Sequence, residues 1–558
     1  MIGSLPPAEF IPSELSRRRF LTLLGLLPLT ACAPSEPAAE PVAGEGGPAY
    51  GDTLVDASIG DISGLIPNIT SDSSSHEIGS LIYSNLVRTD KNLRLEGELA
   101  EGWDISKDQL TITFHLRRGV KWHDGTELTA DDVDFTYRYM IDPKTPTAYA
   151  ESFRQIRHAE VVDHFTYRVT YDKPYSPGLL SWGIWILPRH ILERPWKAGV
   201  DLRTTPQNTT PFGSGPYLFR QWNTGEKVVL EANPEYFEGR PYIRRVVYRI
   251  IPDPATTFLE LKARNIDMTG LTPIQYRRQT DYPAFRKGFN KYRYLANGYA
   301  YLGFNLLDSR FQDKRVRQAM AHAINKKEII EGVLLGLGQE AVGPYKPGTW
   351  WYKADVKTYP FDPERAKALL AEAGWKDRNS EGVLVRNGQP FSFTIRTNQG
   401  NQVRQQTAEI IQRRLRAVGI DAKIHIVEWA AFINQFIRKK DYEAIILGWG
   451  LGLDPDQYDI WHSSKTGPDE LNHISYKNPK VDELLEAGRR TFDEAERKAI
   501  YGEFQDIMAE EQPVVFLYVP DALQVVSSRV RAIEPAPAGI TYNFIKWYVP
   551  ANLQRYTR

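Results

Sequence analysis

His123 and Asp124 are adjacent in the sequence, and a histidine beside an aspartate is a combination used in general acid–base catalysis. Asp124 is followed by Gly125, and an Asp-Gly pair ahead of a capped helix is a typical turn sequence. We therefore interpret the pair as structural. The sequence also has no Gly-x-Ser-x-Gly motif that would present a nucleophilic serine. These residues do not favour an enzyme.

Carboxylates that could bind a cation occur at Asp454, Asp456 and Asp459. Their Asp-Pro-Asp context favours turn and N-cap roles over metal binding. The chain has 10 histidines, but none stands in a His-Glu-x-x-His motif or a similar ligand spacing. The sequence therefore predicts neither a metal site nor a cofactor.

Glycine-rich segments bind phosphate only in the right structural context. The segment 336–341 has the form of a dinucleotide-binding pattern, but it follows a predicted helix instead of a strand. No Gly-x-x-x-x-Gly-Lys-Ser/Thr sequence is present. The chain is not predicted to hydrolyse ATP by such a loop, so an ATP-driven process would need a separate ATPase.

Cys32 is the only cysteine of the 558 residues, which excludes disulfides within the chain and cysteine-based metal sites. It ends the sequence Leu-Thr-Ala-Cys, which resembles a bacterial lipobox. Arg17 and Arg18 precede an apolar run too short to span a bilayer, as in a removable signal of the twin-arginine type. The resemblance implies cleavage before Cys32 and acylation of its thiol. We predict a signal peptide with a lipobox over 1–32 and a disordered tether over 33–49, which is rich in Pro, Ala, Glu and Gly.

The length of the remaining chain predicts two or more domains. The 69 basic and 69 acidic residues of the chain balance, so nothing favours nucleic acid as a partner. Hydrophobic residues make up 42% of the chain, its mean hydropathy is −0.42, and no later apolar run has membrane-spanning length. These values predict a soluble, globular protein.

The elements that must position any site alternate between strands and helices. Alternating apolar residues predict strands such as 111–116, and strands dominate from about 50 to 300. Helix start signals such as Asp362 with the proline after it mark a region of alternating helices and strands over about 310–515. A strand pattern returns at 514–518. The chain is predicted to be α/β, with its first part completed by the C-terminus.

Several sequence blocks, in a fixed order over most of the chain, carry a family resemblance. They lie at 85–90, 99–103, 114–125, 128–133, 213–217, 230–237, 313–319, 371–375 and 476–482. Together they resemble family 5 extracellular solute-binding proteins, the dipeptide, oligopeptide and nickel receptors of ABC importers.

The resemblance implies an α/β two-lobe periplasmic-binding-protein type II fold with an extra subdomain in the first lobe, similar to cluster C. We expect lobe I over 50–300, including the extra subdomain at about 95–210. We expect lobe II over 301–514 and a C-terminal return to lobe I over 515–558. The resemblance also implies a monomer.

The resemblance places ligand-binding residues in the loop 448–456, around Trp449. In peptide receptors of the family this loop supplies an aspartate to the ligand's α-ammonium, but the expected position is Gly452 here. A buried ammonium needs a countercharge. Either Asp454 substitutes through a shifted loop, or the ligand lacks a free N-terminus.

Arg404, at the start of the helix predicted from 402, is a candidate to hold a ligand carboxylate, because its planar guanidinium can form two parallel hydrogen bonds. A solvated arginine at a helix start is the alternative. Further ligand-binding candidates lie in segments where the family builds its cleft: Asn472, Tyr345, Trp350 and Trp351. For the two tryptophans, a place in the core is an equally good interpretation.

The sequence leads to the hypothesis of a substrate-binding lipoprotein without chemistry of its own. It would capture a peptide-like solute between two closing lobes and deliver it to an ABC permease that has separate ATPase subunits. It would be exported and lipid-anchored at the cell envelope, in the periplasmic space or on the outer face of the cytoplasmic membrane. One alternative keeps this architecture but changes the cargo to an oligosaccharide, an opine-like solute or a metal chelate. An exported hydrolase or a sensory receptor is a further alternative.

Overall fold

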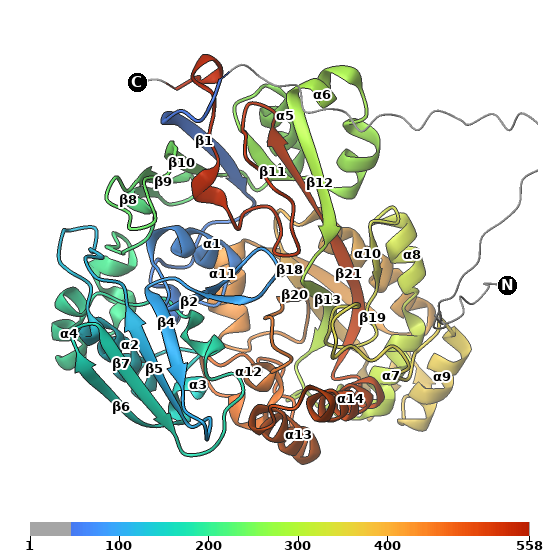
Figure 1. Cartoon of the computed structure of the whole chain (residues 1–558). Helices are drawn as coiled ribbons and strands as arrows, with labels where there is room; N and C mark the ends of the chain where they lie inside the picture. The colour runs from blue at the N-terminus through green and yellow to red at the C-terminus, as the bar shows by residue number, and fades with distance from the viewer. Residues whose placement is uncertain (1–45, 557–558) are drawn as a thin grey trace, which may run out of the picture. The chain divides into compact units, whose positions relative to one another are not determined.

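The computed structural model describes residues 46–556 (Figure 1). The predicted lipid-attachment residue Cys32, the signal residues Arg17 and Arg18, and nearly all of the predicted tether lie outside the described residues. Within 46–556, the structure contains no helix whose length and apolar character together would let it cross a membrane.

One group of paired strands is built around β1 (Gly51–Ser58), which pairs in parallel with β10 (Ile243–Ile250). The neighbouring strands extend this group on both sides: β8 (Tyr217–Asn223), β9 (Lys227–Ala232), β11 (Met268–Gly270) and β12 (Phe289–Leu295). Its helices are α1 (Ser73–Ile82), α5 (Pro254–Lys262) and α6 (Pro283–Gly288).

A second group of strands contains mixed parallel and antiparallel pairs in the order β19-β18-β20-β13. Its members are β13 (Gly298–Phe304), β14 (Gly338–Glu340), β18 (Ser392–Asn398), β19 (Asp421–Val427) and β20 (Ala444–Gly450). Its helices are α7 (Lys314–Ala323), α8 (Lys326–Gly332), α9 (Pro363–Glu372), α10 (Gln402–Ala417), α11 (Trp429–Ala431), α12 (Tyr458–Trp461), α13 (Pro479–Arg490) and α14 (Glu494–Glu511).

The long strand β21 (Val514–Ser527) belongs to both groups (Figure 1). Its first half pairs with β13 and its second half, from Asp521, pairs with β12. The chain therefore passes between the groups at 296–297 and again at Pro520. We use the name lobe I for residues 46–295 and 521–556, and lobe II for residues 298–519.

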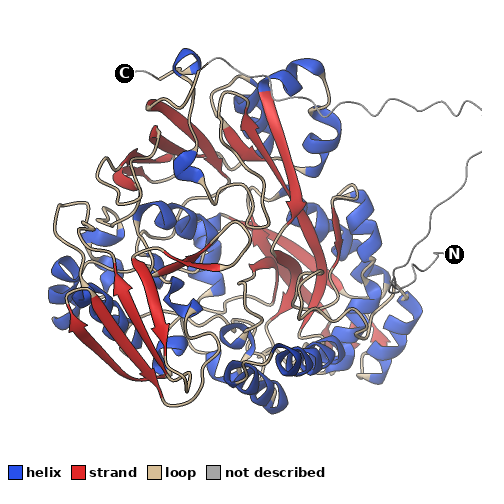
Figure 2. Ribbon diagram, in the orientation of Figure 1, coloured by secondary structure: helices blue, strands red, loops and turns tan. Residues whose placement is uncertain are grey.

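Lobe I carries a separate antiparallel sheet with its own apolar core, seen at the lower left of Figure 2. Its strands are β4 (Ala100–Ile105), β5 (Thr111–Leu116), β7 (Thr166–Tyr171) and β6 (Ile156–Asp163), in that spatial order. The helices here are α2 (Ala130–Ile141), α3 (Glu151–Arg154) and α4 (Arg189–Lys197), and the short pair β2 (Val87–Thr89) and β3 (Leu95–Gly97) lies nearby. We propose that these elements form the extra subdomain expected at about 95–210.

Local sequence signals set several element boundaries as predicted. Helix α2 starts with a capping box between Thr129 and Asp132, which satisfies N–H groups at the helix start. Helix α9 starts at Pro363 after the cap Asp362, and α10 is followed by Gly419 with a left-handed φ of 94°. The burial of β5 alternates along its length, as the sequence pattern predicts.

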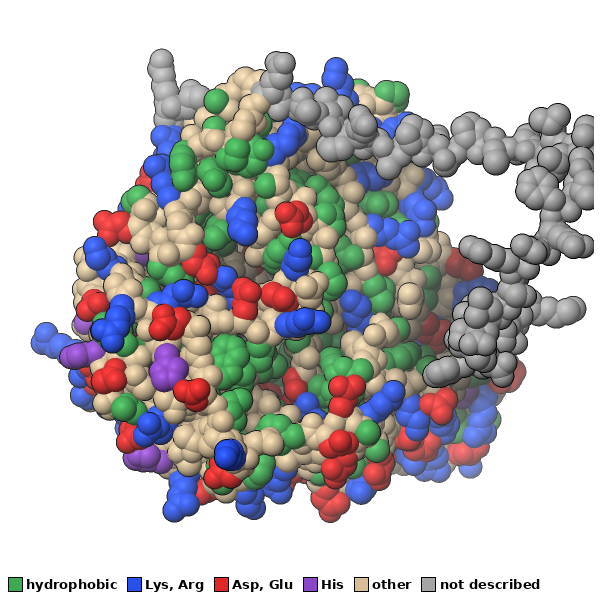
Figure 3. Space-filling model, in the orientation of Figure 1, with side chains coloured by type: hydrophobic (Ala, Val, Ile, Leu, Met, Phe, Trp, Pro, Cys, Tyr) green, Lys and Arg blue, Asp and Glu red, His purple; other side chains and the backbone are tan. Residues whose placement is uncertain are grey.

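Acidic and basic side chains are intermingled over the face shown in Figure 3. This distribution is consistent with the formal net charge of zero, and that face has no extended patch of a single sign.

Candidate functional site

A cavity of about 640 Å³ lies between lobe I and lobe II and has residues of both in its wall. This volume falls within the range of about 300–1,000 Å³ that is usual for ligand pockets. Lobe I contributes side chains that include Asp72, His76 and Tyr149, and lobe II contributes Arg404, Trp429, Trp449, Glu470 and His473. The combination of aromatic surface with a few charged groups is what a site for an amphipathic solute requires.

One wall of the cavity is the end of strand β20. Strand β13 pairs along the whole of β20, whereas β18 pairs with it only at Ala444 and Ile445. The following residues Leu447, Gly448, Trp449 and Gly450 all line the cavity. This part of β20 therefore offers a strand edge to a ligand that can pair with a backbone.

Arg404 lies in the first turn of α10, and its backbone N–H donates to the capping side chain of Asn401 at 3.0 Å. Its guanidinium donates to Asn398 Oδ1 at 2.8 Å. No carboxylate of the described residues lies within ion-pair distance of it, and burial lowers the pKa of Arg404 from its usual value. Gly448 leaves room for this side chain, because a Cβ there would lie 3.2 Å from Arg404 Nη2. The arginine is held in place but lacks a countercharge.

The aromatic surface of the cavity includes Trp449, which stacks on the buried ring of His473 at a centroid distance of 5.3 Å. Burial lowers the pKa of His473 to about 3, so its imidazole is neutral. His473 Nε2 lies 2.9 Å from the hydroxyl of Tyr301. On another part of the wall, the indole N–H of Trp429 is buried and has no hydrogen-bond partner within the protein.

The two lobes touch beside the cavity. Lys465 of lobe II donates to Glu151 of lobe I at 3.1 Å, and the backbone N–H of Ser176 donates to the carbonyl of Arg489 at 2.8 Å. Gly60 of lobe I packs against Trp429 of lobe II. The lobes are therefore in a closed arrangement.

Asp454 is not free to bind a ligand ammonium. Both of its carboxylate oxygens accept hydrogen bonds from Arg497, at 2.7 and 3.0 Å, and the Arg497 side chain is buried. Asp454 also does not line the cavity between the lobes. The neighbouring Asp456 accepts a hydrogen bond from Arg489 at 2.8 Å. The structure therefore corrects the suggestion that a shifted loop brings Asp454 to the ligand.

Asn472 also has a structural role. It is fully buried, and its amide donates to the carbonyls of His462 and Tyr476 and accepts from the N–H of Tyr476. These bonds hold the loop that contains Glu470 and His473, so Asn472 shapes the cavity without lining it.

Tyr345, Trp350 and Trp351 belong to an apolar cluster of lobe II and do not line the cavity. The hydroxyl of Tyr345 donates to the carbonyl of Pro455, and its ring packs at 6.3 Å from that of Trp351. Trp350 meets Trp351 edge to face at 5.1 Å. The sequence left open whether the two tryptophans lie in the cleft or in the core. In the structure they pack in the core of lobe II.

The sequence did not identify the lobe I residues His76 and Tyr149, nor Trp429, Glu470 and His473 of lobe II. Trp429 carries a usable signal, because it comes soon after the strand predicted at 421–426, as Trp449 comes soon after the apolar run 444–447. The other four residues lie in helices and loops. These segments reach the cavity only because of the way in which the two lobes meet.

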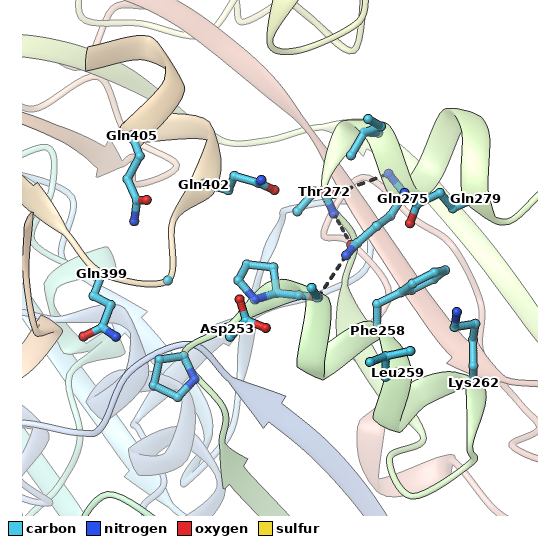
Figure 4. Close-up of a pocket in the computed structure, with 15 residues that line it drawn as sticks. Asp253, Phe258, Leu259, Lys262, Thr272, Gln275, Gln279, Gln399, Gln402 and Gln405 are labelled. Carbon is cyan, nitrogen blue, oxygen red and sulfur yellow. Dashed lines mark hydrogen bonds between the residues drawn. The ribbon is translucent and has the colours of Figure 1, made fainter. Parts of the chain in front are cut away.

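A second cavity of about 570 Å³ lies between α5 of lobe I and the start of α10 in lobe II (Figure 4). Gln399, Gln402 and Gln405 line one side, and Figure 4 shows them facing Asp253 and Gln275 across the gap. Gln275 is occupied, since it donates to the carbonyl of Pro254 and accepts from the N–H of Thr272. Phe258 is the one aromatic side chain in the lining of this cavity, whereas the first cavity has several, so the first is the better candidate for a binding site.

The structure supports no catalytic role for His123. Its Nδ1 accepts from the N–H of Gly213 at 3.1 Å and its Nε2 donates to the carbonyl of Gly215, while Asp124 bonds His190 instead. Burial lowers the pKa of His123 to about 4. Among residues 46–556, no group of three or more His, Cys, Asp or Glu side chains is arranged to hold a metal ion.

Comparison with known proteins gives similar sequences and similar folds. The chain is 36% identical over 517 residues to the oligopeptide-binding protein AppA of Bacillus subtilis (strain 168), covering 90% of this chain and 93% of that protein. The structure of AppA in complex with a nonapeptide is similar with a TM-score of 0.86 and 34% identity, covering 90% of this chain and 100% of that one. NikZ of Campylobacter jejuni in complex with Ni(L-His) is similar with a TM-score of 0.78 and 29% identity, covering 89% and 99%.

These likenesses identify the fold as the mixed α/β fold of periplasmic binding proteins, as the sequence predicted. The model of the bacterial extracellular solute-binding proteins, family 5 middle region, matches residues 94–470. This family consists of receptors that bind solutes, and its members are not enzymes. With more than half of its length matched, the chain belongs to the family 5 bacterial extracellular solute-binding proteins.

Proposed function

We propose that this protein is the peptide-binding receptor of an ABC importer. The observation that carries the proposal is the closed cavity between the lobes, in which Arg404 has no countercharge and the edge of β20 is open. A peptide has the two groups that these features require, a carboxylate and a backbone that can pair with a strand edge. The similarity to AppA, whose structure holds a nonapeptide, supports the same class of ligand.

Binding would work by closure of the lobes around the ligand. The segments 296–297 and 519–521 are the hinge, since the strand pairing changes from one lobe to the other at both. The ligand contacts both walls only in the closed arrangement, so its binding shifts the population toward that arrangement. Closure also removes water, which strengthens the charge-assisted bonds to the ligand.

The sequence supports the rest of the proposal. A lipid on Cys32 would hold the protein at the cell envelope after export through the Arg17-Arg18 signal. A permease with separate ATPase subunits would then take the peptide from the closed receptor. The receptor acts as a monomer, and no nucleic acid takes part.

Titration calorimetry of the purified residues 46–558 with oligoalanines of two to nine residues tests this function. We expect binding of one peptide per chain, together with a smaller radius of gyration by small-angle X-ray scattering when the peptide is present. The peptide should be recovered intact after long incubation. Cleavage of the peptides, or the absence of binding at every length, would contradict the proposal.

A further inference from the structure

The carboxylates that line the cavity differ in how far they are satisfied. Asp72 accepts from a backbone N–H at the start of α1 at 2.9 Å. Asp469 pairs with Arg438 at 2.7 Å, and Asp521 pairs with Arg293 at 2.6 Å. These three have partners of their own, and Glu470 is the fourth carboxylate in the lining.

Glu470 has a more distant partner than the other three. Its Oε2 is buried and accepts no hydrogen bond, and the nearest cation, Lys465 Nζ, is 3.6 Å away. That distance exceeds the usual 2.7–3.2 Å of an N–H···O bond. A buried acceptor without a donor is costly, and Glu470 lines the cavity, so a cationic donor that reached its carboxylate from there would be favourable.

Lys465 cannot neutralise Glu470, because it is shared. Its ammonium is almost fully buried, donates to Glu151 at 3.1 Å and lies 3.9 Å from Asp459. One positive charge thus serves three carboxylates. The nearby Arg489 hydrogen-bonds Asp456 instead, and it is 4.0 Å from Asp459. Arg154 lies 3.9 Å from Glu151 and offsets part of that charge, but Lys465 is the one cation within ion-pair distance of Glu470 among the described residues, and it is shared.

The opposite imbalance exists in the same cavity at Arg404, a cation without a carboxylate. The lining therefore offers one unmatched positive and one undersatisfied negative group. A zwitterionic ligand would satisfy both, and a peptide with free ends is such a ligand.

We propose that Glu470 binds the α-ammonium of the peptide whose carboxylate Arg404 holds, in the role that the family resemblance assigns to an aspartate at the position of Gly452. This proposal rests on the proposed function, because it assumes a peptide ligand. It also answers the question that Asp454 leaves open, since that side chain is already paired with Arg497.

Binding of an ammonium by Glu470 should depend on pH. Burial raises the pKa of Glu470 above its usual value, and Lys465, Arg154 and Glu151 are the charged groups that act on it. Only the ionised carboxylate attracts an ammonium. Affinity for a peptide with a free N-terminus should therefore fall as the pH decreases toward this raised pKa, at a higher pH than for an ordinary glutamate, and binding at such a pH should release a proton.

The test compares the oligoalanine that the wild-type protein binds best with its N-acetylated form, by calorimetry. We expect the wild-type protein to prefer the free amine at least about tenfold, the equivalent of about 1.4 kcal/mol. Glu470→Gln should bind both forms with the affinity that the wild-type protein has for the acetylated one, and its binding should not depend on pH. Unchanged affinity for the acetylated peptide shows that the variant is folded.

Glu503→Gln is the matched control, since it makes the same change at a lobe II glutamate that pairs with Lys480 at 3.3 Å and lies outside the cavity lining. It should leave the affinity for both peptides, and therefore the preference, as in the wild-type protein. A preference that persists in Glu470→Gln, or an equal loss of affinity for both peptides, would overturn the assignment of Glu470 and leave the proposed function standing. If the wild-type protein bound no oligoalanine, the proposed function itself would fail.

Discussion

At the scale of single residues, Arg404 and Asp454 look alike in the sequence but differ in the structure. The sequence makes both of them candidates for pairing with a charged end of the ligand. The guanidinium of Arg404 donates a hydrogen bond to the amide oxygen of Asn398 and forms no ion pair with the described residues. Asp454, in contrast, accepts hydrogen bonds from two nitrogens of the Arg497 guanidinium. Whether a charge is already paired decides if it can serve a ligand.

Arg404→Gln should weaken binding of a peptide with a free C-terminus about 10- to 100-fold, because a charge-assisted hydrogen bond contributes about 1.5–3 kcal/mol. The same peptide with a C-terminal amide should bind the variant and the wild-type protein alike. Arg413→Gln is the control on the same helix, since Arg413 bonds Glu328 and does not line the cavity. Calorimetry with both peptides measures the effect, and equal losses for the acid and the amide would refute the role of Arg404.

Asp454→Ala should destabilise the fold rather than change the choice of ligand. It leaves the buried Arg497 without its partner, and breaking such a pair costs about 3–5 kcal/mol. A lower midpoint in urea denaturation is expected, with an unchanged preference for free over N-acetylated peptide. Loss of that preference at unchanged stability would instead make Asp454 the ammonium anchor.

At the scale of elements, two glycines let the lobes come together. A Cβ at Gly60 of lobe I would lie 2.5 Å from the Cβ of Trp429 in lobe II, which is closer than real side chains approach. A Cβ at Gly400 of lobe II would lie 2.8 Å from the carbonyl oxygen of Pro252 in lobe I. These contacts exist only when the lobes are closed. The absence of a Cβ at the two glycines therefore permits closure.

Gly60→Ala should therefore hinder closure without unfolding either lobe. An overpacked contact costs about 1–3 kcal/mol, so the affinity for every peptide should fall about tenfold or more. Scattering should show a smaller contraction on binding than in the wild-type protein. Gly102→Ala is the control, because a Cβ there meets nothing within 4 Å. Normal affinity and full contraction in Gly60→Ala would contradict this role.

The difference between local and long-range contacts explains which features the sequence can predict. The helix starts at Thr129 and Asp362 follow from side chains that bond their own next turn, so a local pattern suffices. The partner of Asp454 is Arg497, 43 residues further along the chain, and only the fold brings them together. Trp350 and Trp351 have the composition of a binding surface but pack in the core of lobe II. Whether a segment forms a helix or a strand can be predicted from neighbouring residues. Which charged side chains pair across different elements cannot, because it depends on the fold.

At the scale of the whole described chain, β21 and the segment 296–297 connect the two lobes, and the cavity lies where the lobes meet. The fold class was predictable because ordered sequence blocks span most of the chain. The residues that line the cavity were less predictable than the fold class, because the cavity forms only where the two lobes meet. We expect the molecule as a whole to close on a peptide and to release it unchanged.

The most direct test is native mass spectrometry of residues 46–558 purified from cells, followed by identification of whatever is released on denaturation. We expect one ligand per chain, found as a series of short peptides with both ends free. A sugar, an opine or a metal chelate as the bound species, or an empty protein that cleaves added peptides, would contradict it.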